Sequence, residues 1–96
     1  MDHFAWGRVM EQNLYSIYTR DLCAYCDMAK EEMKKRKLPY TEYNVESYPA
    51  HKEELKKLNP KARTVPQIFV GKTLIGGYME FIEYCENALG ANVDNI

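Results

Sequence analysis

The segment LYSIYTRDLCAYC, residues 14–26, runs from an apolar stretch directly into two cysteines spaced C-x-x-C. The stretch at 13–19 is rich in aromatic and β-branched residues, which predicts a strand. Two thiols at this spacing at the end of a strand suit few chemistries. One is a thiol–disulfide redox pair, and the other is half of a zinc or iron–sulfur site. The motif by itself leaves both open.

The residues after this strand predict a helix at 25–37, which separates the two thiols chemically. Cys23 falls at the helix N-terminus, where unpaired backbone N–H groups and the helix dipole stabilise a thiolate. Arg20, three residues upstream, adds positive charge. Cys26 falls in helical phase with the apolar, buried face. We therefore expect Cys23 to be the exposed attacking thiol and Cys26 the shielded resolving thiol.

The composition indicates one small globular domain and argues against several classes of function. A net charge of −1 over 96 residues gives no reason to expect nucleic-acid or membrane-surface binding. No apolar stretch approaches the roughly 18 residues needed to span a bilayer, and the first residues lack the features of a secretory signal. We expect a cytoplasmic protein. Lasting structural disulfides are rare in the cytoplasm, so the C-x-x-C is expected to be catalytic or metal-binding.

A zinc site is the less favoured interpretation of the two cysteines. It would need two further ligands, and only Cys85, His3 and His51 remain, none of them paired at a metal-ligand spacing. Cys85 shares a helical face with apolar neighbours that include Ala88, so we expect it to fill the core. We therefore predict no metal site.

The rest of the chain predicts an α/β fold. The elements after the first helix are a strand at 40–45, a helix at 48–58, strands at 67–70 and 73–75, and a helix at 79–89 closed by Gly90. The order β-α-β-α-β-β-α predicts a four-stranded mixed sheet flanked by three helices, with the first two strands parallel and the last two antiparallel. Leu55 and Leu58 are expected on one buried helix face. The domain spans 13–90, with an N-terminal extension at 1–12, expected to pack as an extra turn or strand, and a tail at 91–96.

Two further motifs predict the walls of a pocket. The string RTVPQ at 63–67 places a proline at the start of a strand, and two geometries stay open there. A cis Val65–Pro66 bond would turn the N–H and C=O of Val65 outward as an edge for a bound peptide, whereas a trans proline is common at an edge strand. Gly76-Gly77 before a helix is a generic cradle for a carboxylate or phosphate. With two arginines nearby, the pocket suits a small anionic thiol peptide.

The strings YTR at 18–20, CAYC at 23–26, TVPQIFV at 64–70 and IGGY at 75–78 together resemble the motifs of dithiol glutaredoxins. The resemblance covers residues 13–90 and implies a thioredoxin fold with a cis proline. It implies a glutathione-dependent thiol–disulfide oxidoreductase that reduces protein disulfides and glutathione mixed disulfides, with no obligatory metal. The catalytic pair would be Cys23 and Cys26, and the glutathione groove would be lined by Arg20, Tyr25, Thr64, Val65, Pro66, Gly77, Tyr78 and Met79.

The resemblance also implies how glutathione lies in that groove. Val65 would pair with the cysteinyl backbone, and the helix start after Gly77 would receive the γ-glutamyl carboxylate. Lys52 is a candidate for the glycyl carboxylate, although a solvated helix lysine is the more common role. The implied partners are glutathione and disulfide-containing proteins, with ribonucleotide reductase as a first candidate, and we expect a monomer.

Two departures from the family pattern keep alternatives open. Ala24 stands where the family usually has proline, and small residues there also occur in glutaredoxins that bind a [2Fe–2S] cluster between two protomers, through Cys23 and glutathione. Met79 stands where the family usually has a polar or acidic residue, which removes a side-chain partner for glutathione, although Glu80 could supply the acid. A redoxin that is reduced by thioredoxin reductase is therefore the second alternative.

Overall fold

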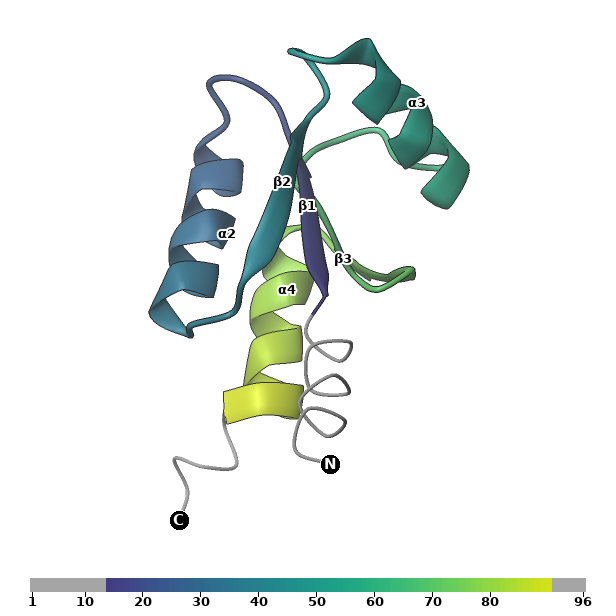
Figure 1. Cartoon of the computed structure of the whole chain (residues 1–96). Helices are drawn as coiled ribbons and strands as arrows, with labels where there is room; N and C mark the ends of the chain where they lie inside the picture. The colour runs from purple at the N-terminus through teal and green to yellow at the C-terminus, as the bar shows by residue number, and fades with distance from the viewer. Residues whose placement is uncertain (1–13, 91–96) are drawn as a thin grey trace, which may run out of the picture.

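The computed structural model describes residues 14–90, which form one mixed sheet between two layers of helices (Figure 1). The elements in order are β1 (Tyr15–Thr19), α2 (Ala24–Lys35), β2 (Tyr40–Asn44), α3 (Pro49–Leu58), β3 (Gln67–Val70), β4 (Thr73–Gly76), α4 (Tyr78–Tyr84) and a π-helical continuation, η1 (Cys85–Gly90). The predicted strand start at 13, the extension at 1–12 and the tail at 91–96 lie outside the described residues.

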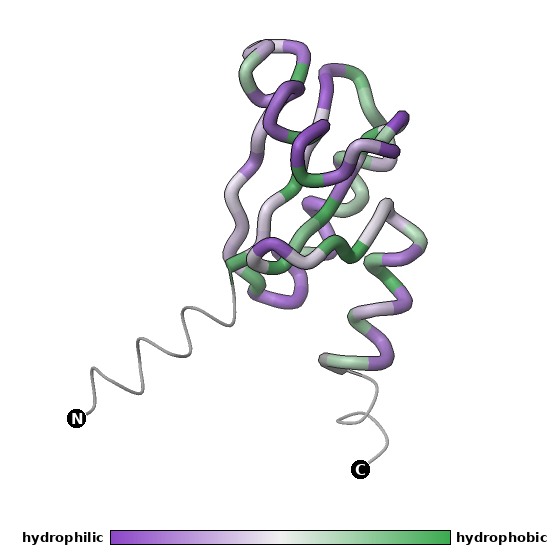
Figure 2. The backbone as a smooth tube through the Cα atoms, turned by 90° about the vertical axis from the view of Figure 1, so that its right-hand side faces the viewer, coloured by the Kyte–Doolittle hydropathy of each residue, from purple (hydrophilic) through white to green (hydrophobic). Residues whose placement is uncertain are grey.

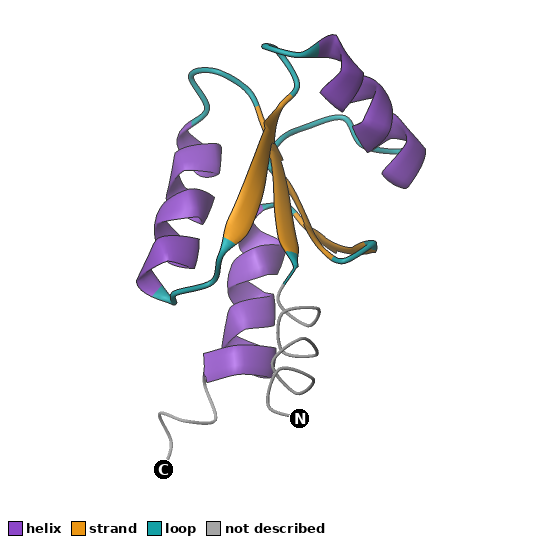
Figure 3. Ribbon diagram, in the orientation of Figure 1, coloured by secondary structure: helices purple, strands orange, loops and turns teal. Residues whose placement is uncertain are grey.

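The topology confirms the predicted β-α-β-α-β-β-α order and the thioredoxin fold. The strands lie in the order β2-β1-β3-β4. β1 and β2 are parallel, and β3 is antiparallel to both β1 and β4. Figure 3 shows the strands as a central layer with helices on both sides. Within residues 14–90, none of the helices combines the length and the apolarity that a membrane span requires.

Alternation along β1 and β3 divides the core between the two faces of the sheet. Ile17 of β1 and Ile68 of β3 pack with α2 and α4. Tyr18 and Phe69, one residue further along each strand, pack with Leu55 of α3. As a result α2 and α4 cover one face and α3 covers the other (Figure 1).

The predicted helix at 25–37 ends earlier than expected, at Lys35. Lys37 adopts the left-handed conformation, with φ of 60°, and the Leu38 N–H donates to the Met33 carbonyl at 2.9 Å. This is a Schellman-type ending, which glycine usually marks in a sequence. A lysine at that position leaves no such mark.

The predicted α-helix at 79–89 is wrong in its second half, because the chain is α-helical only to Tyr84 and π-helical from Cys85. The wider π-helical turn changes which residues share a face. Cys85 is buried in the core as predicted, but Ala88 is exposed. Figure 2 shows this C-terminal helical segment alternating between hydrophilic and hydrophobic residues along its turns.

The expectation for the helix at 48–58 is also half right. Leu55 is buried against β1 and β3, but Leu58 is exposed. Leu58 is the last residue of α3, and the chain turns away at Asn59 toward β3. A helical face stays covered only where the sheet lies beneath it.

A polar cluster ties α2 to the edge of the sheet. The Thr19 hydroxyl donates to Glu42 Oε2 at 2.7 Å, and Lys30 Nζ donates to the same oxygen at 3.0 Å and to Oε1 at 3.2 Å. Burial would raise the pKa of the Glu42 carboxyl, but the hydrogen bonds from Thr19 and Lys30 outweigh it and lower that pKa below its usual value. The ionised form of Glu42 therefore stabilises the fold.

We predict that Glu42→Gln lowers the free energy of unfolding at pH 7 by about 0.5–1 kcal/mol, a modest loss because solvent partly screens this carboxylate. A depressed pKa in the folded state contributes stability above the unfolded pKa, and that stability is lost as pH falls through the folded pKa. The difference between the two proteins should shrink toward zero in acid, as measured by urea unfolding across pH. Glu53→Gln, at an exposed position of α3, is the matched control. A difference that stays constant with pH would contradict this assignment.

The turn from β4 into α4 depends on Gly76. Its φ is +130°, and a Cβ placed there would lie 2.7 Å from Glu80 Cβ. Glu80 is held in that position because its Oε1 accepts the Gly77 N–H at 3.0 Å. Gly71, in the turn between β3 and β4, also has a positive φ of +60°, but its missing Cβ would meet nothing within 4 Å.

We therefore predict unequal effects of alanine at these two glycines. Gly71→Ala carries only the cost of the left-handed conformation and should lower the free energy of unfolding by about 1 kcal/mol. Gly76→Ala adds a clash to a strained backbone and should cost about 3 kcal/mol or more. Urea unfolding of both variants measures the two losses. Equal losses would show that Glu80 moves aside without cost.

Candidate active site

Cys23 and Cys26 are joined as a disulfide at the N-terminus of α2. Cys23 is the N-cap residue, with extended backbone, and its Sγ accepts the Cys26 N–H at 3.1 Å. The main chain of α2 begins at the same residue, because the Asp27 N–H donates to the Cys23 carbonyl at 3.1 Å. The sulfur of Cys23 thus receives a helix-terminal N–H, which stabilises negative charge on it after reduction.

The burial of the two cysteines corrects one expectation. Cys26 is 1% exposed and therefore shielded, as predicted, but Cys23 is only 7% exposed rather than openly accessible. The cause is the segment before β3, since Cys23 Sγ lies 3.9 Å from the carbonyl oxygen of Val65. The segment before β3 therefore covers one side of Cys23.

Arg20 acts on the loop that carries Cys23. Its Nη1 donates to the carbonyl oxygens of Asp21 at 3.1 Å and of Leu22 at 3.5 Å. Leu22 has a positive φ of 52°, and its side chain is 96% exposed. The Arg20 guanidinium thus holds the carbonyls of this loop, and the exposed side chain of Leu22 directly precedes Cys23 in the chain.

The Val65–Pro66 peptide bond is cis, as the resemblance implies. Within residues 14–90, no hydrogen bond engages the Val65 N–H. Gln67, a residue that sequence reasoning gave no role, holds this segment from below. Its buried side chain donates to the Thr64 carbonyl at 3.0 Å and accepts from Asn59 Nδ2 at 3.2 Å. The main chain of Val65 is therefore positioned and open to pairing.

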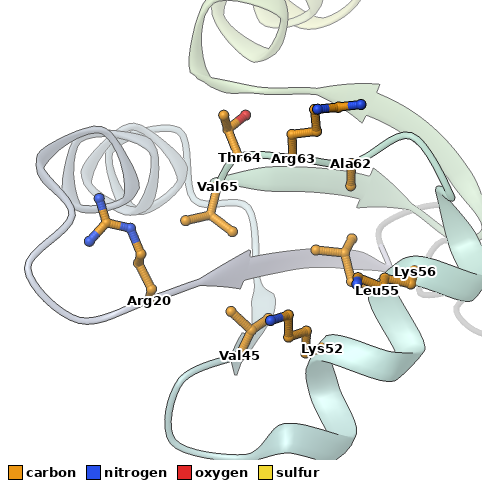
Figure 4. A pocket seen from close by; sticks show the side chains of 9 residues that line it. All are labelled: Arg20, Val45, Lys52, Leu55, Lys56, Ala62, Arg63, Thr64 and Val65. Atoms are coloured by element: carbon orange, nitrogen blue, oxygen red, sulfur yellow. The ribbon is translucent and has the colours of Figure 1, made fainter.

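Two hollows meet at Thr64 and Val65. The first, which we call the basic hollow, is shown in Figure 4 and is lined by Arg20, Val45, Lys52, Leu55, Lys56, Ala62, Arg63, Thr64 and Val65. The second, the aromatic hollow, is lined by Tyr25, Thr64, Val65, Pro66, Gly77, Tyr78, Met79 and Glu80. The structure thus brings the eight predicted glutathione-groove residues to two adjoining hollows. Arg20 lies in the basic hollow, five residues lie in the aromatic hollow, and Thr64 and Val65 belong to both.

The aromatic hollow differs from the simple anion cradle that the diglycine predicted. The Gly77 N–H already donates to Glu80 within the chain. Tyr25 and Tyr78 stack with ring centroids 5.7 Å apart, and Met79 is 69% exposed beside them. This end of the site therefore offers apolar and aromatic surface.

The basic hollow contains residues that the sequence did not single out. Lys56 and Ala62 line it together with Lys52 and Arg63. The nine side chains come from the residues that follow β1 and β2, from α3 and from the segment before β3 (Figure 4). The run of lysines in the sequence of α3 was a possible signal, because residues one turn apart share a helix face.

The remaining cysteine, Cys85, lies in the core rather than in these hollows. Burial raises the pKa of the Cys85 thiol, so this thiol stays neutral as a core side chain.

Within residues 14–90, no group of three or more His, Cys, Asp or Glu side chains could hold a metal ion. A [2Fe–2S] cluster held between two protomers would take only Cys23 from each chain, with glutathione as the other ligand. The side chains of a single chain do not test that alternative, which stays a prediction.

Comparison with known proteins places these motifs in one family. The family model described as Glutaredoxin matches residues 16–75. Glutaredoxin 3 of Escherichia coli K12 is 36% identical over 61 residues, which cover 64% of this chain and 72% of the relative. A glutaredoxin of Vibrio cholerae is 32% identical over 80 residues, which cover 77% of this chain and 92% of the relative.

Solved structures agree with the sequence matches. Oxidised E. coli glutaredoxin superimposes with a TM-score of 0.67 at 32% identity, over 79% of this chain and 96% of the other. The glutaredoxin-like protein NrdH-redoxin of E. coli, described as having a thioredoxin-like activity profile, gives 0.62 at 26% identity, over 72% and 88% of the chains. A buckwheat glutaredoxin–glutathione complex shares the fold, with 0.67 at 21% identity over 88% and 82%. The chain belongs to the glutaredoxin family, and it is a thiol–disulfide oxidoreductase with a thioredoxin fold and a Cys23–Cys26 redox pair.

Proposed function

We propose that this glutaredoxin depends on glutathione and reduces both protein disulfides and glutathione mixed disulfides. The observation that carries the proposal is the position of Cys23, at a helix N-terminus and 3.9 Å from the Val65 carbonyl, where the basic and aromatic hollows meet. A disulfide-bearing peptide laid along Val65 brings its sulfur to the one cysteine whose thiolate the helix stabilises.

The reaction follows from the roles of the two thiols. The Cys23 thiolate attacks a sulfur of the substrate disulfide, the substrate S–S bond breaks, and the departing thiolate takes the electron pair. With a protein substrate, the Cys26 thiolate then attacks Cys23, which releases the reduced substrate and forms the Cys23–Cys26 disulfide of the oxidised state. Two molecules of glutathione restore the dithiol and leave as glutathione disulfide. With a glutathione mixed disulfide, a second glutathione can resolve the intermediate without Cys26.

In this proposal glutathione lies across Val65 with an end in each hollow. Its cysteinyl backbone pairs with the Val65 main chain, its glycyl carboxylate lies among the cations of the basic hollow, and its γ-glutamyl end enters the aromatic hollow. The contacting residues would be Arg20, Tyr25, Thr64, Val65, Pro66, Gly77, Tyr78 and Met79. The buckwheat glutaredoxin, which shares the fold, forms a complex with glutathione.

We predict that Cys23→Ser abolishes reduction of glutathione mixed disulfides, because the attacking thiolate is lost. Cys26→Ser should keep this activity within a few-fold and lose the dithiol reduction of protein disulfides. Cys85→Ala is the matched control, since Cys85 is buried in the core. The measurement is glutathione-coupled NADPH oxidation with each substrate type. Full activity of Cys23→Ser would sink the mechanism.

A second candidate is a redoxin of the same fold that takes its electrons from thioredoxin reductase. Two observations at the aromatic hollow favour it. Met79 offers glutathione no side-chain hydrogen bond, and the Gly77 N–H already donates to Glu80 Oε1 and is not free for a ligand. A carboxylate at that end of glutathione would meet the like charge of Glu80. The structural similarity to a redoxin with a thioredoxin-like activity profile points the same way.

NADPH oxidation with two reducing systems separates the candidates. We expect turnover with glutathione plus glutathione reductase and little with thioredoxin reductase alone, because the glutathione site retains the basic hollow and the Val65 edge. The same disulfide substrate and the same concentration of protein serve in both assays, and Cys23→Ser is the blank. Turnover with thioredoxin reductase alone would establish the second candidate in place of the first.

A further inference from the structure

The two hollows have opposite chemical character, which glutathione alone does not explain. We propose that they form a bipartite docking surface for a protein substrate, namely an extended segment with an apolar or aromatic residue just before its disulfide cysteine and acidic residues just after it. This inference rests on the proposed exchange at Cys23 and names the class of substrate that the groove selects.

The basic hollow has more positive charge than a single carboxylate can use. Four of its nine lining residues are cationic, namely Arg20, Lys52, Lys56 and Arg63, and none is acidic. Within residues 14–90, every ion pair lies on α2 and its C-cap residue Arg36, or joins α2 to β2, so these four cations have no carboxylate partner there. Unpaired cations above an apolar floor attract acidic side chains and speed their encounter.

The floor of the basic hollow strengthens this attraction. Val45, Leu55, Ala62 and Val65 line it, so a carboxylate that enters is partly withdrawn from water. Charge-assisted hydrogen bonds to arginine are stronger in such surroundings than on an open surface. The chemistry of this end therefore fits two or more acidic residues in sequence.

The aromatic hollow has the opposite preference. Tyr25 is 58% exposed and stacks on Tyr78, and the exposed side chain of Met79 adds apolar surface to the same hollow. The one acidic lining residue, Glu80, already accepts the Gly77 N–H. Contiguous exposed apolar side chains beside a reactive group mark a contact surface, and the charge of Glu80 disfavours an acidic side chain there.

The main chain of Val65 sets the direction of the bound segment. From Arg63 to Pro66 the chain runs from the basic hollow to the aromatic hollow. An antiparallel partner exchanges both backbone hydrogen bonds between Val65 and one residue, and it runs the opposite way. Since Cys23 Sγ lies 3.9 Å from the Val65 carbonyl, the residue opposite Val65 is the substrate cysteine. Its N-terminal neighbour then lies in the aromatic hollow and its C-terminal neighbours in the basic hollow.

The test uses the full-length Cys26→Ser protein, which stops at the mixed disulfide, and four peptides bearing a thionitrobenzoate disulfide on their single cysteine. The sequences are Phe-Cys-Glu-Glu, its neutral form Phe-Cys-Gln-Gln, its polar form Ser-Cys-Glu-Glu and the reversed order Glu-Glu-Cys-Phe. The Cys23 thiolate attacks the peptide sulfur, the bond to thionitrobenzoate breaks, and the coloured thiolate leaves with the electron pair. The second-order rate constant is read from its absorbance.

We expect Phe-Cys-Glu-Glu to react about three- to tenfold faster than each of the other three peptides. Its advantage over the neutral peptide should fall with added salt, because salt screens exposed charges. Lys56→Gln should bring the ratio of acidic to neutral peptide toward one. Lys57→Gln, an exposed neighbour on α3 outside the hollow, should leave that ratio unchanged.

Three outcomes overturn the inference, and they differ in how far they reach. Equal rates for all four peptides would refute the docking surface while leaving exchange at Cys23 intact. Fastest reaction of the reversed peptide would refute the antiparallel direction. Failure of all four peptides and of the corresponding glutathione disulfide would remove the proposed function as well.

Discussion

The antiparallel pairing of β1 with β3 is the constraint on which the rest of the site depends. Its register places Tyr18 opposite Gln67, so the residues that follow β1 must meet the residues that precede β3. Cys23 and Val65, far apart in the sequence, thereby come within 3.9 Å at Sγ and the carbonyl oxygen. The parallel pairing of β1 with β2, which places Thr19 opposite Asn44, brings the start of α3 to the same edge of the sheet.

The N-termini of α2 and α4 both lie beside the groove, and their backbone N–H groups donate to different acceptors. At α2 the capping group is the sulfur of Cys23, so the N–H that stabilises the helix start also stabilises the reactive thiolate. At α4 the cap is the Glu80 carboxylate, which leaves less positive potential for a ligand. The charge available to a ligand lies instead on the side of α3, where cations of the basic hollow have no acidic neighbours among its lining residues.

Much of this fold was predictable, because its signals are local. Alternating apolar residues, a C-x-x-C at a helix start, a proline at a strand start and paired glycines each constrain a few neighbouring residues. The errors arose where the structure used a residue against its usual preference. Lys37 takes the left-handed conformation that glycine normally marks, and the chain widens into a π-helix after Tyr84, which moves Ala88 off the buried face. Neither feature has a distinct pattern in the sequence.

The sequence by itself determined the order of the elements, which follows from residue type and spacing within short segments. It also indicated the redox pair and the family, through the resemblance of its combined motifs to one known family. Only the tertiary structure decided how far Cys23 is buried, that Glu80 occupies the Gly77 N–H, and that the predicted groove residues divide between a basic and an aromatic hollow. Those properties depend on which segments the sheet register brings together, and no single segment contains that information.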